Sequence, residues 1–132
     1  MCLDLDCVRD LLIYLEKSIQ MDSHLKTIPI PVTQIHKDHK MSKYPLTQIA
    51  YTCQKLSEGG FISLQTKWNT SSDHVLLVED ITYSGLQMLE SIRSPQVYRK
   101  TKSAIQKVGS YSLDIVKDVA SSVITNMIFG SR

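Results

Sequence analysis

Two histidines three residues apart form the one cluster in this sequence with metal-like residues. His36-Lys37-Asp38-His39 would place both imidazoles on one face of a helix, and imidazole nitrogen is a common zinc ligand. A zinc site needs further ligands, and neither His24 nor a cysteine lies at a usual spacing to supply one. We therefore expect a solvated polar turn and no bound metal.

Groups that could act as nucleophiles or bases are scattered along the chain. The three cysteines, Cys2, Cys7 and Cys53, form no CxxC pair, and Cys53 falls in the apolar stripe of a predicted helix, where a thiol packs as a small core residue. No nucleophile elbow, phosphate-binding loop or dinucleotide fingerprint occurs. The sequence therefore favours a binding protein that is not an enzyme and holds no cofactor.

One predicted helix presents side chains suited to DNA. Apolar residues at three- and four-residue steps predict a helix over residues 45–58, opened by Pro45 and ended by Gly59-Gly60. Its inward stripe consists of Leu46, Ile49, Ala50, Cys53 and Leu56. The residues left on the exposed face are Thr47, Gln48, Tyr51, Thr52 and Lys55. Glutamine can read adenine edges, and threonine or tyrosine can reach phosphates.

Basic and aromatic residues outside this helix extend the candidate DNA surface. They are Lys40 and Lys43 before it, Lys67 and Trp68 near the tip of a predicted hairpin, and Arg99, Lys100 and Lys102 in a later helix. The net charge is only +2, but residues 23–43 carry four lysines against one aspartate, and residues 93–110 carry five basic residues and no acid. These two segments would make one basic patch if they meet in space.

Each of these features also has a second interpretation. No arginine lies between Arg9 and Arg93, although arginine is the commonest reader of guanine, so the face of helix 45–58 is equally that of a structural helix in solvent. Trp68 at a loop tip is either a protein-binding anchor or a side chain folded back on the domain. The basic helix suits phosphates, an acidic protein patch or plain solvent.

Apolar periodicity and capping residues predict the remaining elements. Further helices are expected over residues 6–19, 32–41, 82–93, 95–108 and 112–129, with Thr82, Ser94 and Ser112 as N-caps. Residues 28–31 are expected to be extended, because each proline disfavours a helical conformation in the residue before it. Residues 61–65 and 74–80 are predicted strands, joined by a polar loop over residues 66–73.

This order of elements predicts a mainly α, α+β fold: a winged helix-turn-helix with a two-stranded wing and a C-terminal helical hairpin. Three helices would bury their stripes together while the β-hairpin packs along the open side of the bundle. The winged-helix domain is expected over residues 1–93 and the helical extension over 94–132. The apolar stripe of the last helix is too wide to leave in water, so this helix packs on the core or on a second subunit.

Three stretches of the sequence resemble domain-of-unknown-function family 2513 of bacteria and their phages. They are residues 5–12 with Glu16, residues 49–62, and residues 81–89, the last being similar to the family's Leu-Thr-Trp-x-Gly-x-x-Phe-Leu motif. Thr82, Gly85 and Leu89 match that motif, whereas Tyr83 and Met88 replace its tryptophan and phenylalanine. The resemblance implies a winged-helix fold, and it brings no catalytic residues with it.

These observations lead to a function hypothesis with one alternative. The first is a non-enzymatic bacterial or phage regulator that binds double-stranded DNA. The alternative is a protein–protein interaction module on the same scaffold, a phage- or mobile-element-encoded adaptor or inhibitor; a homodimer through the C-terminal helix is compatible with either. The start of the chain is acidic where a signal peptide is basic, and no apolar run approaches about 18 uncharged residues. We therefore expect a cytoplasmic protein without a membrane partner.

Overall fold

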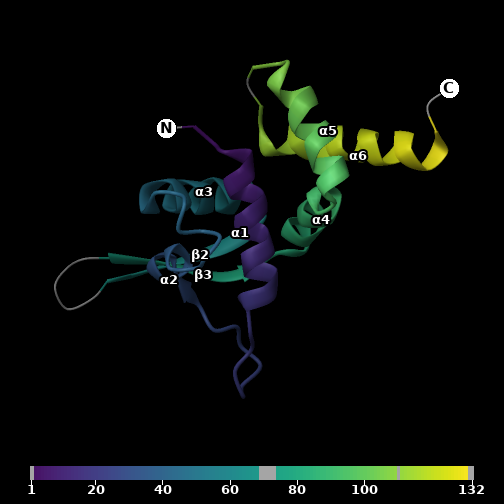
Figure 1. Cartoon of the computed structure of the whole chain (residues 1–132). Helices are drawn as coiled ribbons and strands as arrows, with labels where there is room; N and C mark the ends of the chain where they lie inside the picture. Colours follow the sequence, from purple (N-terminus) through teal and green to yellow (C-terminus); the bar gives the residue numbers. More distant parts are fainter. Residues whose placement is uncertain (1, 69–73, 110, 131–132) are drawn as a thin grey trace. The chain divides into compact units, whose positions relative to one another are not determined.

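The chain folds into a mixed α+β structure with one small antiparallel sheet (Figure 1). The computed structural model describes residues 2–68, 74–109 and 111–130, and the side chains of residues 67, 68, 74 and 75 lie outside that description. Two compact units divide the chain, Met1–Leu86 and Gln87–Arg132, and the division falls inside helix α4 (Tyr83–Ile92). The elements before α4 are α1 (Leu5–Ser18), β1 (Ile30–Pro31), α2 (Val32–His36), α3 (Leu46–Glu58), β2 (Ile62–Trp68) and β3 (His74–Ile81).

Helix α1 forms within a residue of its predicted bounds and supplies a large part of the first unit's core. Asp4 caps it, since its carboxylate accepts a hydrogen bond from the Asp6 backbone N–H at 3.0 Å, as a short carboxylate at this position can. Five apolar residues of this segment occur at helical spacing: Val8, Leu11, Leu12 and Leu15 are fully buried, whereas Ile19, just beyond the end of the helix, is only partly buried. The three- and four-residue spacing therefore identified the buried face of this helix correctly.

Helix α2 is shorter than predicted, because a turn replaces its second half. The helix ends at His36 rather than near residue 41. Beyond it, the Asp38 carboxylate accepts a hydrogen bond from the Lys40 backbone N–H at 3.0 Å, and the Met41 N–H donates to the Asp38 carbonyl. Such local bonds compete with helix formation. The turn brings Met41 into the core, where its side chain is fully buried.

Helix α3 begins directly after Pro45 and packs against α1, α2 and β2. Ile49, Cys53 and Leu56 are fully buried as predicted, whereas Leu46, also expected to face inward, is 39% exposed. The chain leaves the helix through Gly60, whose φ of 82° lies in the left-handed region that glycine adopts without steric cost. This conformation turns the chain directly from α3 into β2.

The three strands form an antiparallel sheet in the order β1-β3-β2. Val78 of the central strand pairs with Ile30 of β1 on one side and Leu64 of β2 on the other. The hairpin is longer than predicted: the loop was expected from residue 66, yet β2 continues to Trp68, which pairs with His74. Thr66 and Trp68 are of strand-favouring types, and extending the ladder pairs further backbone groups. Trp68 therefore ends a strand instead of lying in a loop.

The second unit contains the two helices expected after α4, α5 (Pro95–Gln106) and α6 (Leu113–Phe129), which pack against each other. Both N-caps are as predicted: the Ser94 and Ser112 hydroxyls accept backbone N–H bonds at 3.4 and 3.3 Å. Four-residue steps place Val97, Thr101 and Ile105 on the buried side of α5, and Leu113, Val116 and Ala120 are buried on α6. Helix α5 ends at Gln106, two residues earlier than predicted.

Replacing Thr101 with valine should stabilise the chain by about 1 kcal/mol. Thr101 is fully buried, and among the described residues its hydroxyl has no hydrogen-bond partner. Valine has nearly the same shape and is also β-branched, so it removes the cost of the unpaired polar group without opening a cavity. Thermal unfolding followed by circular dichroism measures the effect. A lower melting temperature for Thr101→Val would show that the hydroxyl makes a stabilising bond.

Candidate binding surface

The outer face of α3 carries four of the side chains predicted to contact DNA. Thr47 is exposed, and Gln48, Tyr51 and Lys55 are partly exposed. The Lys55 ammonium lies 5.5 Å from the centre of the Tyr51 ring, within cation–π range, and pairs with the Glu58 carboxylate at 3.2 Å. The Gln48 side-chain amide donates to the Cys2 carbonyl at 3.1 Å. The face thus combines hydrogen-bonding groups with a lysine that a neighbouring acid partly neutralises.

Thr52 does not belong to this face, and its prediction as an exposed residue is wrong. The side chain is fully buried, and its hydroxyl donates to the Gln48 carbonyl at 2.7 Å and lies 3.5 Å from the Cys7 sulfur. Internal hydrogen bonding lets a threonine occupy a buried helix position. The spacing carried the signal, since Thr52 follows Ile49 by three residues and precedes Leu56 by four.

The turn between α2 and α3 supplies further lysines beside the first turns of α3. Lys40 is exposed, and Lys43 is 63% exposed although its ammonium pairs with the Asp10 carboxylate of α1 at 3.3 Å. Lys37, which the sequence reasoning did not assign to the site, is also exposed in this turn. Its membership in the basic segment 23–43 was the available signal. These lysines and the outer face of α3 are called the α3 surface below.

A buried hydrogen bond fixes this turn to α1. The Tyr44 hydroxyl donates to the Asp10 carboxylate at 2.7 Å, and the Tyr44 side chain is almost completely buried. Burial, reinforced by the hydrogen bond to Asp10 and its negative charge, raises the pKa of Tyr44 well above its usual range. Asp10 therefore joins α1 to the turn that precedes α3.

Two of the three cysteines are core residues. Burial raises the pKa of the Cys7 thiol to about 11 and that of Cys53 to about 12, so both stay protonated near neutral pH. A thiolate is the reactive form of cysteine. These two groups therefore act as small apolar side chains, as predicted for Cys53, while Cys2 is exposed.

The remaining predicted site residues belong either to side chains outside the description or to the second unit. The side chains of Lys67 and Trp68 lie outside the described part of the chain. Arg99, Lys100 and Lys102 belong to α5 in the second unit, where Arg99 and Lys100 are exposed and Lys102 is partly buried. A single patch that joins the two basic segments stays a prediction.

The described residues contain neither a cluster of metal ligands nor a helix suited to span a membrane. No group of three or more histidine, cysteine or carboxylate side chains is arranged there to hold a metal ion. His36 is partly buried, and His39 is exposed. Among the same residues, none of the helices combines the length and hydropathy that a transmembrane span requires.

The Thr82–Gly85 motif fastens the start of α4 to the turn between α3 and β2. The Thr82 hydroxyl donates to the Gly60 carbonyl at 2.6 Å and accepts from the Gly85 N–H at 3.1 Å. The Thr82 N–H donates to the Phe61 carbonyl at 3.0 Å. An ideal Cβ on Gly85 would lie 2.0 Å from that same carbonyl oxygen, so this position has no room for a side chain. The motif is accounted for by packing of the first unit.

Comparisons with known proteins identify the family without supplying an activity. Searches of curated proteins and of solved structures find no match. A family model described as "Hypothetical protein (DUF2513)" matches residues 2–112, which confirms the resemblance noted in the sequence. The match takes in the first unit, α4 and α5, and it stops before α6. Since it spans most of the chain, the protein belongs to this family.

Proposed function

We propose that the first unit is a winged helix that binds double-stranded DNA, with α3 entering the major groove. The observation that carries this proposal is the order α1-β1-α2-α3-β2-β3 combined with the sheet order β1-β3-β2. A short strand after the first helix, which pairs with the returning strand of a hairpin, supports a winged helix with that hairpin as the wing. In helix-turn-helix proteins the second helix of the motif lies in the major groove.

The chemistry of the α3 surface is compatible with this role. The hydroxyl of Thr47 and the amide of Gln48 are groups that contact phosphates and base edges. Lys37, Lys40 and Lys43 lie in the turn before α3, where cations would meet the phosphates beside the groove. In this proposal the protein is a regulator in a bacterium or phage, and Arg99, Lys100 and Lys102 of α5 add phosphate contacts.

The test is fluorescence anisotropy of labelled mixed-sequence duplex DNA, titrated with the full chain at several salt concentrations. We expect binding at low salt that weakens steeply as salt rises, because phosphate contacts release bound counterions. Lys40→Ala should lower the salt-dependence slope by about one unit. Lys26→Ala removes the same charge from the loop between α1 and β1, which lies at the other end of α1 from α3 (Figure 1), and should leave binding unchanged.

Glu58→Gln provides a change in the opposite direction within the same experiment. It removes the carboxylate that pairs with Lys55 and that would repel phosphates, so affinity for DNA should rise and the salt dependence should steepen. The exposed pair contributes little to stability, so the variant should fold like the unaltered chain. Absence of binding at about 50 mM salt, where phosphate contacts are strong, would rule out the DNA proposal.

A protein-interaction module is the second candidate, and the ion pairs of the α3 surface favour it. Lys55 and Lys43 both already have carboxylate partners, Glu58 and Asp10, which weakens the field that this surface offers to phosphates. The exposed apolar residues at the end of α6 also suit a protein partner. If the protein binds another protein, lysine substitutions around α3 should leave the affinity for that protein nearly unchanged. If the partner contacts α6, a charged substitution at the exposed end of α6 should weaken its binding.

A further inference from the structure

One side chain on the α3 surface is held in place from both ends. Gln48 lies in the first turn of α3 and is partly exposed. Its backbone carbonyl accepts a hydrogen bond from the buried Thr52 hydroxyl at 2.7 Å, and its side-chain amide donates to the Cys2 carbonyl at 3.1 Å. A glutamine on the outer face of a helix otherwise samples several rotamers. These two bonds restrict both the position and the direction of the amide.

The carbonyl that accepts from Gln48 belongs to a well-anchored part of the first unit. Cys2 lies two residues before Asp4, the N-cap of α1. Leu5, the first residue of that helix, is almost completely buried, and α1 packs against α3. The start of α1 therefore places the Cys2 carbonyl beside the first turn of α3.

The chemistry of this acceptor decides which way round the amide lies. A backbone carbonyl accepts hydrogen bonds and cannot donate them, so the nitrogen of the Gln48 amide, and not its oxygen, must face Cys2. One of the two amide hydrogens is used in this bond. The amide oxygen and the second hydrogen are left for a partner. The α3 surface thus offers one acceptor beside one donor at this position.

Base edges in the major groove differ in how well they match this pair of groups. Adenine presents an amino donor at N6 beside an acceptor at N7, which complements an acceptor beside a donor. Guanine presents two acceptors, O6 and N7, so one of them would face the glutamine oxygen without a hydrogen atom between the two. An amide in this orientation therefore favours adenine over guanine.

We propose that Gln48 gives the α3 surface a preference for adenine and that the Cys2 carbonyl is the group that positions it. This inference rests on the proposed binding of double-stranded DNA through α3. The N-terminal part of a recognition helix contacts base edges, and Gln48 is the third residue of α3. Because the amide is already oriented in the free protein, binding does not have to order it, which strengthens the contact.

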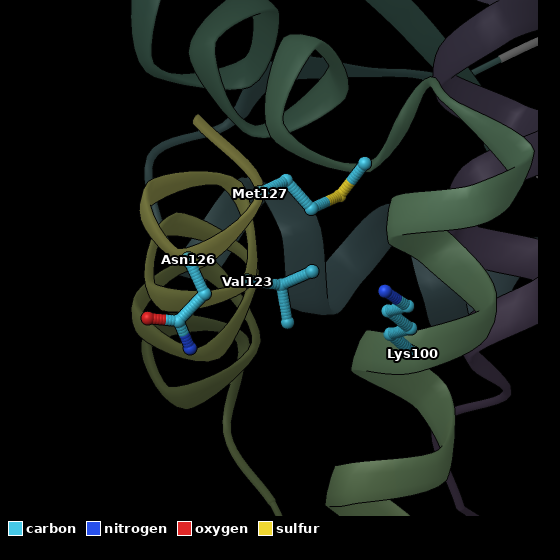
Figure 2. A pocket seen from close by; sticks show the side chains of 4 residues that line it. All are labelled: Lys100, Val123, Asn126 and Met127. Carbon is cyan, nitrogen blue, oxygen red and sulfur yellow. The ribbon is translucent and has the colours of Figure 1, made fainter. Parts of the chain in front are cut away.

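The basic residues of α5 do not supply such a preference. In the proposed binding mode they contact phosphates, and phosphate contacts position a protein on DNA without carrying sequence information. Lys100 is also directed into the groove between α5 and α6. Figure 2 shows its side chain opposite Val123 and Met127 of α6, with Asn126 turned away. The base preference is therefore expected from α3.

The test selects duplexes from a library with a randomised central segment and then measures single duplexes by fluorescence anisotropy. The full chain should select adenine at one position, and exchanging that A·T pair for G·C should weaken binding about tenfold or more. Gln48→Met keeps the length of the side chain and its helix preference but cannot read the base, so the exchange should then have almost no effect. Gln54→Met is the matched control: it makes the same change at an exposed glutamine of α3 and should keep the preference.

Gln48→Glu should change the preference instead of abolishing it. A carboxylate has acceptors only, so it cannot donate to the Cys2 carbonyl or to adenine N7, but it can accept from cytosine N4. The selected base should therefore move from adenine to cytosine. A merely structural role of Gln48 does not produce such a change.

The positioning role of Cys2 has a readout without DNA. NMR relaxation should give a higher order parameter for the side-chain amide of Gln48 than for that of Gln54, because a hydrogen bond restrains the first. Equal order parameters would overturn the positioning role. An adenine preference that survives in Gln48→Met, or equal binding of all duplexes by the unaltered chain, would overturn the base preference and leave the DNA proposal standing. Absence of binding to any duplex at low salt would contradict both.

Discussion

Gly85→Ala should lower the free energy of unfolding by about 4 kcal/mol or more, a large fraction of the total stability of a single domain. The added methyl group would lie 2.0 Å from the Phe61 carbonyl oxygen and 2.8 Å from the Ile81 side chain. The first contact is with backbone, which cannot move without breaking the Thr82 N–H bond to the same oxygen. Denaturant unfolding followed by circular dichroism measures the loss.

Two other glycines provide matched controls for this result. Gly60 and Gly109 have φ values of 82° and 88°, and an added Cβ would meet nothing within 4 Å at either position. Alanine there brings only the strain of a left-handed conformation, about 1 to 2 kcal/mol. If Gly85→Ala lowers the free energy of unfolding no more than Gly60→Ala does, α4 does not approach Phe61 closely.

This junction gives the Thr82–Gly85 motif a structural explanation. Thr82 and Gly85 act together: the threonine hydroxyl bridges the Gly60 carbonyl and the Gly85 N–H, and the glycine admits the Phe61 backbone. The motif therefore positions the end of the hairpin against the end of α3. Residues that bind a partner are better sought outside the motif, on the α3 surface.

Features set by neighbouring residues could be predicted from the sequence. Thr82, Ser94 and Ser112 cap helices as expected, because a cap is decided within about four residues. The buried stripe of α1 followed from spacing alone. The family resemblance is also confirmed, since the family model matches residues 2–112.

Features set by tertiary contacts could not be predicted in the same way. Thr52 was expected in solvent because of its polarity, but α1 lies over it and its hydroxyl bonds internally. The polar turn expected at residues 36–39 is present and depends on Asp38, although a helix was also expected to continue through it to residue 41. The pairing of Lys43 with Asp10 joins residues far apart in sequence. No periodicity indicates such a contact.

The candidate site was predictable as a set of residue types but not as an arrangement of charges. Thr47, Gln48, Tyr51 and Lys55 do share one face of α3. The i, i+3 spacing of Lys55 and Glu58 could have predicted their ion pair, which partly neutralises the lysine on that face. The basic residues of α5 lie in a separate unit, so their contribution depends on how the whole chain meets its partner.

Asp10→Ala is the second substitution expected to have a large effect, about 2 to 3 kcal/mol in the free energy of unfolding. It removes the acceptor of the buried Tyr44 hydroxyl, and a hydrogen bond to a charged group contributes about 1.5 to 3 kcal/mol. Lys43 also loses its partner, but this lysine is mostly exposed and its pair adds only a few tenths of a kcal/mol. Urea unfolding monitored by circular dichroism provides the measurement.

A double-mutant cycle with Tyr44→Phe separates the hydrogen bond from other effects of removing Asp10. If the hydrogen bond accounts for the stabilisation, the double variant should have nearly the same free energy of unfolding as Asp10→Ala alone. Lys43→Ala should lower the free energy of unfolding much less than either variant. Strict additivity of the two losses would contradict a direct Asp10–Tyr44 interaction. Asp10→Asn, which keeps an acceptor oxygen without the charge, should fall between the unaltered chain and Asp10→Ala.

The same bond predicts how stability changes in alkali. Burial and the neighbouring carboxylate raise the pKa of Tyr44, so the folded chain keeps this proton at pH values where an unfolded tyrosine, with a pKa of about 10, has lost it. The folded state then binds more protons than the unfolded state, and stability must fall as pH rises above about 10. Cys7 and Cys53 act in the same direction, so the informative quantity is the difference between the unaltered chain and Tyr44→Phe. That difference should shrink with rising pH, because phenylalanine has no proton to lose; a constant difference would mean that Tyr44 ionises equally easily in both states.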